Sequence, residues 1–155
     1  MTLKNNLHIV RMEYGHLPQV AELEKQCFSQ PWTQAMLREE LDNEFCEMLV
    51  AQDEDECVAG YCGVQMITTE AYITNVAVSP DMRRRGIARA LVKRMIDMAS
   101  ERGMDFITLE VRTSNSNARA LYESLGFSCQ GLRKRYYTNP SEDALIMTLN
   151  LGAQD

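Results

Sequence analysis

The sequence predicts an α/β protein of the mixed α+β kind, in which helices cover both faces of a mostly antiparallel central sheet. Three consecutive strand patterns, at 46–52, 57–68 and 71–78, are joined by short links, which favours an antiparallel meander. Later strand patterns alternate with helix patterns, which favours a mixed sheet. The 155 residues contain no repeat or linker-like stretch, so residues 1–155 are predicted to form one domain.

Each further element has its own local signal. Apolar residues recur at helical spacing over 16–27. Pro31 breaks that helix, Thr33 can cap the next one, and Trp32 can pack on its first turn as a hydrophobic staple. Gly103 and Gly126 supply the ends of two later helices. The remaining predicted elements are a strand at 7–12, a helix at 87–102, a strand at 105–111, a helix at 115–125, and strands at 127–137 and 142–149.

Charge and composition restrict the classes of partner. The formal net charge is −6, whereas a nucleic-acid-binding domain is expected to be basic, so no nucleic-acid partner is predicted. No run of about 20 apolar residues is present, so no membrane partner is predicted either. The first twelve residues lack the apolar core of a signal peptide, and we therefore expect a cytoplasmic protein.

The cysteines and histidines do not suggest a metal site. The five cysteines include no C-x-x-C pair, which favours buried, reduced thiols. The two histidines, His8 and His16, lie far in sequence from every chemical motif and lack the paired spacing of zinc ligands. No metal cofactor is predicted.

A basic, glycine-containing turn opens the helix at 87–102 directly after the strand at 71–78. Unpaired N–H groups and the positive end of the helix dipole favour a bound phosphate there, and guanidinium groups add bidentate hydrogen bonds. The alternative is an arginine-rich helix start that only faces solvent. We interpret the turn as a pyrophosphate site formed by Arg83, Arg84, Arg85, Gly86, Ile87, Ala88 and Arg89.

This turn resembles the acetyl-CoA turn of the GNAT N-acetyltransferases, Q/R-x-x-G-x-G/A, with Arg83, Gly86 and Ala88 at the defining positions. The segment 112–127, with its Asn-led helix and closing Gly-Phe, is similar to the second hallmark of that family. The resemblance implies the GNAT fold, whose sheet is split between its fourth and fifth strands, and acetyl-CoA as cosubstrate. It also implies that the main chain of Val76, Ala77 and Val78 pairs with the pantetheine arm and that Asn115 contacts the cofactor; the alternative for Asn115 is a plain helix cap.

Two further segments resemble one subfamily, the ribosomal-protein-alanine N-acetyltransferases. These are Pro31-Trp32-Thr33 and the stretch 135–147. The resemblance implies acetyl transfer to the N-terminal α-amino group of a protein, with the N-terminal alanine of a small-subunit ribosomal protein as the expected substrate. The expected substrate-binding residues are Trp32, Arg112, Tyr136 and Tyr137. Because successive strand residues point to opposite faces, only one of the two tyrosines is expected to line the peptide slot.

Glu110 is the candidate general base. In the strand at 105–111, alternation places Ile107, Leu109 and Val111 on one face and Glu110 on the other. A carboxylate in mid-strand is unfavourable unless it is paired. The alternative is a structural ion pair with Arg112 or a side chain that reaches solvent. The family resemblance implies that Glu110 accepts the proton of the attacking amine.

Tyr122 is the candidate general acid. A phenol is protonated at neutral pH and can donate to a departing thiolate. Its alternative is a packed helical aromatic, and the resemblance favours the acid.

Two other functions remain open at this point. One is a GNAT enzyme that acetylates a small amine or a lysine side chain, and the other is a CoA-binding module without turnover. The presence of both Glu110 and Tyr122 disfavours the second, and the stretch 135–147 disfavours the first.

Overall fold

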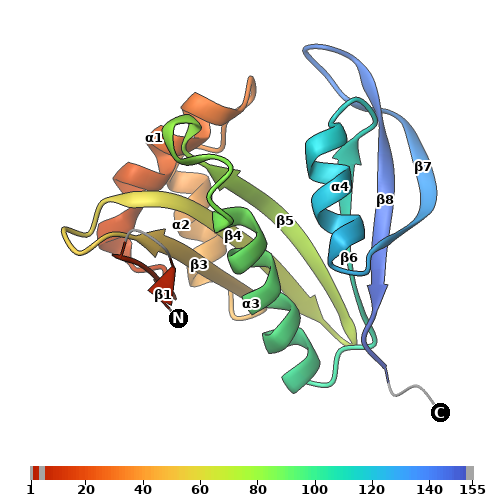
Figure 1. Ribbon diagram of the computed structural model, residues 1–155, viewed down its shortest axis with the longest axis horizontal. Coiled ribbons are helices and arrows are strands. Elements are labelled where there is room, and N and C mark those ends of the chain that lie inside the picture. Colours follow the sequence, from red (N-terminus) through yellow and green to blue (C-terminus); the bar gives the residue numbers. More distant parts are fainter. Residues whose placement is uncertain (1, 4–5, 153–155) are drawn as a thin grey trace. The chain divides into compact units, whose positions relative to one another are not determined.

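The computed structural model describes residues 2–3 and 6–152, with eight strands in one sheet in the order β1-β2-β3-β4-β5-β6-β8-β7 (Figure 1). All predicted helices and strands are present, and a two-residue strand, β1, was not predicted. The elements are β1 (Thr2–Leu3), β2 (Leu7–Arg11), α1 (Leu17–Cys27), α2 (Gln34–Asp42), β3 (Cys46–Gln52), β4 (Val58–Ile67), β5 (Glu70–Val78), α3 (Ile87–Glu101), β6 (Phe106–Arg112), α4 (Ser116–Ser124), β7 (Ser128–Tyr137) and β8 (Glu142–Asn150).

The chain forms two compact units. The first contains Met1–Gln65 and Thr74–Met95, and the second contains Met66–Ile73 and Ile96–Asp155. β4, β5 and α3 therefore each contribute residues to both units. The prediction that residues 1–155 make up a single domain stays a prediction.

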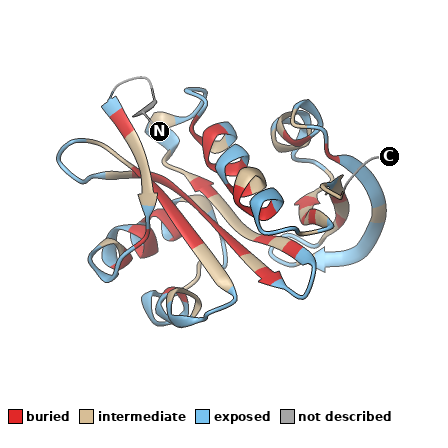
Figure 2. Cartoon of the chain, turned by 90° about the horizontal axis from the view of Figure 1, so that it is seen from below, coloured by how far each residue is buried: buried red, intermediate tan, exposed pale blue. Residues whose placement is uncertain are grey.

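The first unit has helices on both faces of its strands. On one face, Val20 of α1 and Leu37 of α2 join a buried cluster with Tyr61 of β4, each of them fully inaccessible to solvent. On the other face, an added Cβ at Gly60 would lie 3.1 Å from Cγ2 of Ile87, the first residue of α3. The same Cβ would lie 2.9 Å from the Ala77 carbonyl oxygen, so glycine lets β4 approach β5 closely. The buried positions form continuous stretches along β3 and β4, as the red bands of Figure 2 show.

The second unit is organised around β6. β6 pairs in parallel with the first residues of β5, from Glu70 opposite Phe106 to Tyr72 opposite Thr108. On its other side it pairs antiparallel with β8 along its whole length. β7 is the edge strand, and it is largely exposed and irregular, with register shifts between Cys129 and Gly131 and between Arg133 and Tyr137. The sheet is thus mixed, as predicted.

Candidate active site

The arginine-rich turn joins an unusual backbone to the start of α3. The Gly86 carbonyl accepts the first hydrogen bond of α3 from the Ala90 N–H at 3.0 Å. Gly86 and Arg84 have left-handed backbones, with φ of +77° and +64°. The side chains of Arg84 and Arg85 are exposed and have no hydrogen bond or ion pair within the described part of the chain. These groups suit a phosphate, because they combine a helix N-terminus with uncommitted guanidinium groups.

Arg83 points back to the end of β5. Its Nε donates to the Val78 carbonyl at 3.4 Å, and the Cys27 thiol donates to the same oxygen at 3.4 Å. The last carbonyl of β5 is therefore held by the first unit itself. The cofactor contacts expected of Arg83 and of Val76–Val78 stay predictions.

Glu110 lies on the predicted face of β6. Ile107, Leu109 and Val111 are buried on the opposite face, which confirms the alternation. The Glu110 side chain is only 7% exposed. Its carboxylate accepts a hydrogen bond from the Tyr72 hydroxyl and forms an ion pair with Arg133, whose Nε donates to Oε1 at 3.0 Å. The alternative ion pair with Arg112 is not formed. Two donors therefore hold the Glu110 carboxylate. One of them is Arg133, a long side chain that is about half exposed.

Sequence reasoning missed Tyr72. It lies 38 residues before Glu110, and only the parallel register of β5 and β6 brings it to the same face. Burial raises the pKa of Tyr72, and its hydrogen bond to Glu110 raises it further, so the phenol remains a donor throughout the neutral pH range. The available signal was the alternation of β5, which places Tyr72 on the face opposite to the buried Ala71 and Ile73.

The two adjacent tyrosines of β7 do not point to opposite faces, so that prediction was wrong. Their ring centroids are 5.0 Å apart in an edge-to-face contact. The reason is the irregular register of β7, where Arg135 has a φ of +53° and its N–H donates to Asp143 Oδ1 at 2.8 Å. The Tyr136 hydroxyl lies 3.5 Å from that of Tyr72, on the Glu110 side.

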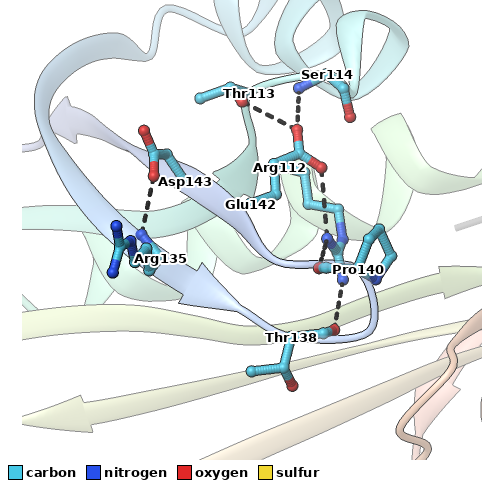
Figure 3. Close-up of polar contacts among 8 residues, drawn as sticks. All are labelled: Arg112, Thr113, Ser114, Arg135, Thr138, Pro140, Glu142 and Asp143. Carbon is cyan, nitrogen blue, oxygen red and sulfur yellow. Dashed lines mark hydrogen bonds and ion pairs between the residues drawn. The ribbon is translucent and has the colours of Figure 1, made fainter.

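Arg112 holds the turn between β7 and β8 (Figure 3). Its guanidinium donates to the Pro140 carbonyl at 3.1 Å and to the Thr138 carbonyl at 3.3 Å, and its carbon Cζ lies 4.4 Å from the centroid of the Tyr137 ring. Burial is the main cause that raises the pKa of Tyr137 to about 12. Arg112 was expected to bind substrate, and the structure shows its side chain engaged by this turn.

Glu142 completes this network from β8. It pairs with Arg112 at 3.4 Å and accepts from the Ser114 N–H at 2.6 Å and the Thr113 hydroxyl at 2.9 Å (Figure 3). Hydrogen bonds from Ser114, followed by those from Thr113 and Arg112, lower the pKa of Glu142 to about 2. The ionised carboxylate thus joins the end of β6 to the β7–β8 turn.

The two remaining predicted residues of the second unit occupy structural positions. Asn115 caps α4, with its Oδ1 accepting from the Ala118 N–H at 3.1 Å, which is the alternative considered for it. Tyr122 is 6% exposed and packs edge-to-face on Phe127 with centroids 5.6 Å apart. Their expected roles toward cofactor and thiolate stay predictions.

Trp32 is half-buried against the core of the first unit, just before α2. Its main-chain N–H donates to Glu24 Oε1 at 2.8 Å. Glu24, in α1, shares the helical spacing of Val20 and Ala21 and is buried with them, but no role was predicted for it.

In the part of the chain that the structure describes, no three or more His, Cys, Asp or Glu side chains are grouped so that they could hold a metal ion. Within the same residues, no helix has the length and apolar character needed to cross a membrane. All five cysteines are free; Cys62 is buried, but Cys57 and Cys129 are exposed, so the prediction of buried thiols was wrong for these two.

Comparison with known proteins agrees with the sequence motifs. Residues 17–127 match the acetyltransferase (GNAT) family. The chain is 36% identical over 146 residues to the ribosomal protein bS18-alanine N-acetyltransferase of Escherichia coli strain K12, covering 93% of this chain and 97% of that protein.

Solved structures give the same result. The crystal structure of the ribosomal-protein-S18-alanine N-acetyltransferase from Escherichia coli superimposes with a TM-score of 0.87 at 34% identity, over 96% of each chain. A chain of the NatC complex bound to Gag peptide and CoA superimposes with a TM-score of 0.85 at 26% identity, over 94% of this chain and 99% of that one. The predicted fold and the predicted acetyltransferase class are confirmed: the chain belongs to the GNAT acetyltransferase family, in the group of the ribosomal-protein-alanine N-acetyltransferases.

Proposed function

We propose that the protein transfers the acetyl group of acetyl-CoA to the N-terminal α-amino group of a protein, and that a small-subunit ribosomal protein beginning with alanine is its substrate. The observation that carries this proposal is the place of Glu110, a nearly buried carboxylate in mid-strand that is held by Tyr72 and Arg133. The 36% identity to the Escherichia coli enzyme supports the substrate class. Such a substrate is made in the cytoplasm, where the protein is expected to act.

The pyrophosphate of acetyl-CoA is assigned to the first unit. The pyrophosphate would contact the N–H groups at the start of α3 and the side chains of Arg84, Arg85 and Arg89, with Gly86, Ile87 and Ala88 contributing main chain. The exposed arginines and the left-handed backbone at Gly86 support this assignment. Calorimetric titration of CoA tests it: Arg84→Ala should weaken binding about 10-fold or more, since a charge-assisted hydrogen bond contributes about 1.5–3 kcal/mol.

The proposed reaction is direct attack of the amine on the thioester. The substrate nitrogen forms a bond to the carbonyl carbon, Glu110 accepts a proton from that nitrogen, and the C–S bond breaks as the thiolate leaves. Tyr122 gives its hydroxyl proton to the sulfur. Tyr122→Phe tests this last step: single-turnover acetylation should slow by about 10²–10⁴-fold. An unchanged rate would show that Tyr122 is not the acid and would leave it a packed aromatic against Phe127.

The substrate class is tested by direct competition of amines. The kcat/KM is measured for an alanine-initiated hexapeptide, for the same peptide with a blocked α-amine and an internal lysine, and for spermidine. We expect the free α-amine to be strongly preferred, because an extended N-terminus can add main-chain hydrogen bonds to exposed strands. Preference for the blocked lysine peptide or for spermidine would replace this proposal with lysine or small-amine acetylation.

A further inference from the structure

Glu24 is a buried charged residue that the proposed chemistry does not use. Among the residues whose burial is described, it is the only charged side chain classed as buried, with 1% exposure. Removing a carboxylate from water is costly unless hydrogen bonds replace the lost hydration. The donors around Glu24 therefore indicate what the carboxylate is for.

Three donors from three segments of the first unit converge on this carboxylate. The Trp32 N–H, in the connection between α1 and α2, lies 2.8 Å from Oε1. The Tyr61 hydroxyl of β4 lies 2.5 Å from Oε2, and Asn75 Nδ2 of β5 lies 3.5 Å from the same atom. Burial raises the pKa of Tyr61, and the negative charge of Glu24 raises it further, so this phenol stays a donor.

The Glu24 carboxylate thus links the α1–α2 connection to β4 and β5 through hydrogen bonds. Main-chain N–H groups in a connection have no helix or sheet partner, and here Trp32 takes its partner from the preceding helix. Asn75 immediately precedes Val76, the first residue of the strand segment assigned to the cofactor. Asn75 directs its amide nitrogen to Glu24, while its side-chain oxygen is buried without a partner among the described atoms.

We propose that Glu24 is a positioning residue that sets the selectivity for the substrate's first residue. By holding the main chain of Trp32 against β4 and β5, it fixes the Trp32 side chain as a wall of a narrow slot that admits alanine or serine. This inference rests on the proposed function and on the expectation from the sequence that Trp32 binds the substrate. Loss of the anchor should let the wall move and admit larger side chains.

Glu24→Gln is the primary variant, because it keeps the shape and one acceptor oxygen but cannot accept from both Trp32 and Tyr61. Glu22→Gln is the matched control: Glu22 is on the same helix, exposed, and paired with Lys25 at 3.9 Å. Tyr61→Phe removes one donor and keeps the carboxylate, and it replaces Glu24→Gln as the decisive variant if circular dichroism shows that Glu24→Gln is not folded.

Two measurements are needed. The ratio of kcat/KM for alanine-initiated over leucine-initiated hexapeptides should fall at least tenfold in Glu24→Gln, while the KM for acetyl-CoA and the kcat for the alanine peptide stay within about threefold. Trp32 is the only tryptophan of the chain, so fluorescence reports on it directly. Its emission should shift to the red and acrylamide quenching should increase in Glu24→Gln but not in Glu22→Gln.

An unchanged alanine-to-leucine ratio in Glu24→Gln overturns the inference, whatever the fluorescence shows. An equal loss of activity with both peptides also overturns it, because it indicates a general structural role. If the wild type acetylates no peptide α-amine at all, the proposed function fails and takes this selectivity with it. If the wild type acetylates the peptides and Glu24→Gln leaves the alanine-to-leucine ratio unchanged, the proposed function stands and only the role of Glu24 in selectivity is lost.

Discussion

Glu24 in the first unit and Glu110 in the second are both carboxylates that accept a hydrogen bond from a strand tyrosine. Glu24 is bonded to Tyr61, which is fully buried, and its other donors are a main-chain N–H and an amide. Glu110 is bonded to the half-buried Tyr72, and its other partner is Arg133, whose side chain is 55% exposed. Neutral donors surround the Glu24 carboxylate. The Glu110 carboxylate instead has a partly exposed cation, Arg133, as one of its two partners.

This difference separates a structural from a chemical use of the same pair of groups. A general base must exchange its proton with a substrate, which requires a partner that can move aside. Arg133 can do so more readily than a buried donor, because its own side chain is 55% exposed and its head group can return to water. The donors of Glu24 cannot move without opening the core. Variants of the two residues test whether turnover depends mainly on Glu110 and stability mainly on Glu24.

The largest expected effect is on turnover. Glu110→Gln should lower kcat by about 10²–10⁴-fold, the usual contribution of a positioned general base, with unchanged CoA affinity. The residual rate should rise with pH as the substrate amine, of ordinary pKa about 7.7–8.0, loses its proton to solvent. Single-turnover kinetics at several pH values measure both. A rate that is within threefold of the wild type would move the base elsewhere.

The next largest effect is on stability. Glu24→Ala should lower the free energy of unfolding by about 2–5 kcal/mol, because it leaves the buried donors of Tyr61 and Trp32 unpaired. Glu110→Ala should cost less, about 1 kcal/mol, because Arg133 is 55% exposed and Tyr72 is only half-buried, so water can replace the lost acceptor. Urea denaturation of both variants gives the comparison. Equal losses in the two variants would show that the environments are energetically alike.

A smaller effect is expected from the partners of Glu110. Tyr72→Phe and Arg133→Met each remove one contact to the carboxylate and should reduce kcat/KM about 10-fold, within the range for one hydrogen bond to a charged group. Neither should change CoA affinity. Lys134→Met, at the exposed neighbour of Arg133 in β7, is the matched control for loss of charge. A loss in Lys134→Met as large as in Arg133→Met would indicate a general electrostatic effect.

The smallest effect concerns Glu142, a third carboxylate, which stabilises the Arg112 network. Its pKa is lowered from 4.5 to about 2, so its ionised form stabilises the folded protein above pH 4.5. That contribution is lost as the pH falls from 4.5 through 2. The difference in unfolding free energy between the wild type and Glu142→Gln should therefore be constant near neutrality and shrink over this window. A constant difference down to pH 2 would contradict the lowered pKa.

The sequence alone determined the fold class, the order of the helices and strands, and the face on which Glu110 lies. Periodicity encodes these features, because an apolar residue that recurs every second or every third to fourth position reports which side of a strand or helix is buried. It also located the basic turn before α3 and the capping roles of Thr33 and Gly103, which depend on a few consecutive residues.

Only the tertiary structure decided which side chains meet. The contact of Tyr72 with Glu110 requires the parallel register of β5 and β6, and the pairing of Arg112 with Glu142 requires the register of β6 and β8. The contact between Tyr136 and Tyr137 depends on an irregular edge strand. The hydrogen bonds of Glu24 to Tyr61 and Asn75 depend on where α1 lies against β4 and β5. Register and packing bring together residues that are distant in sequence. The local pattern of each strand or helix does not determine how it is aligned with its neighbours.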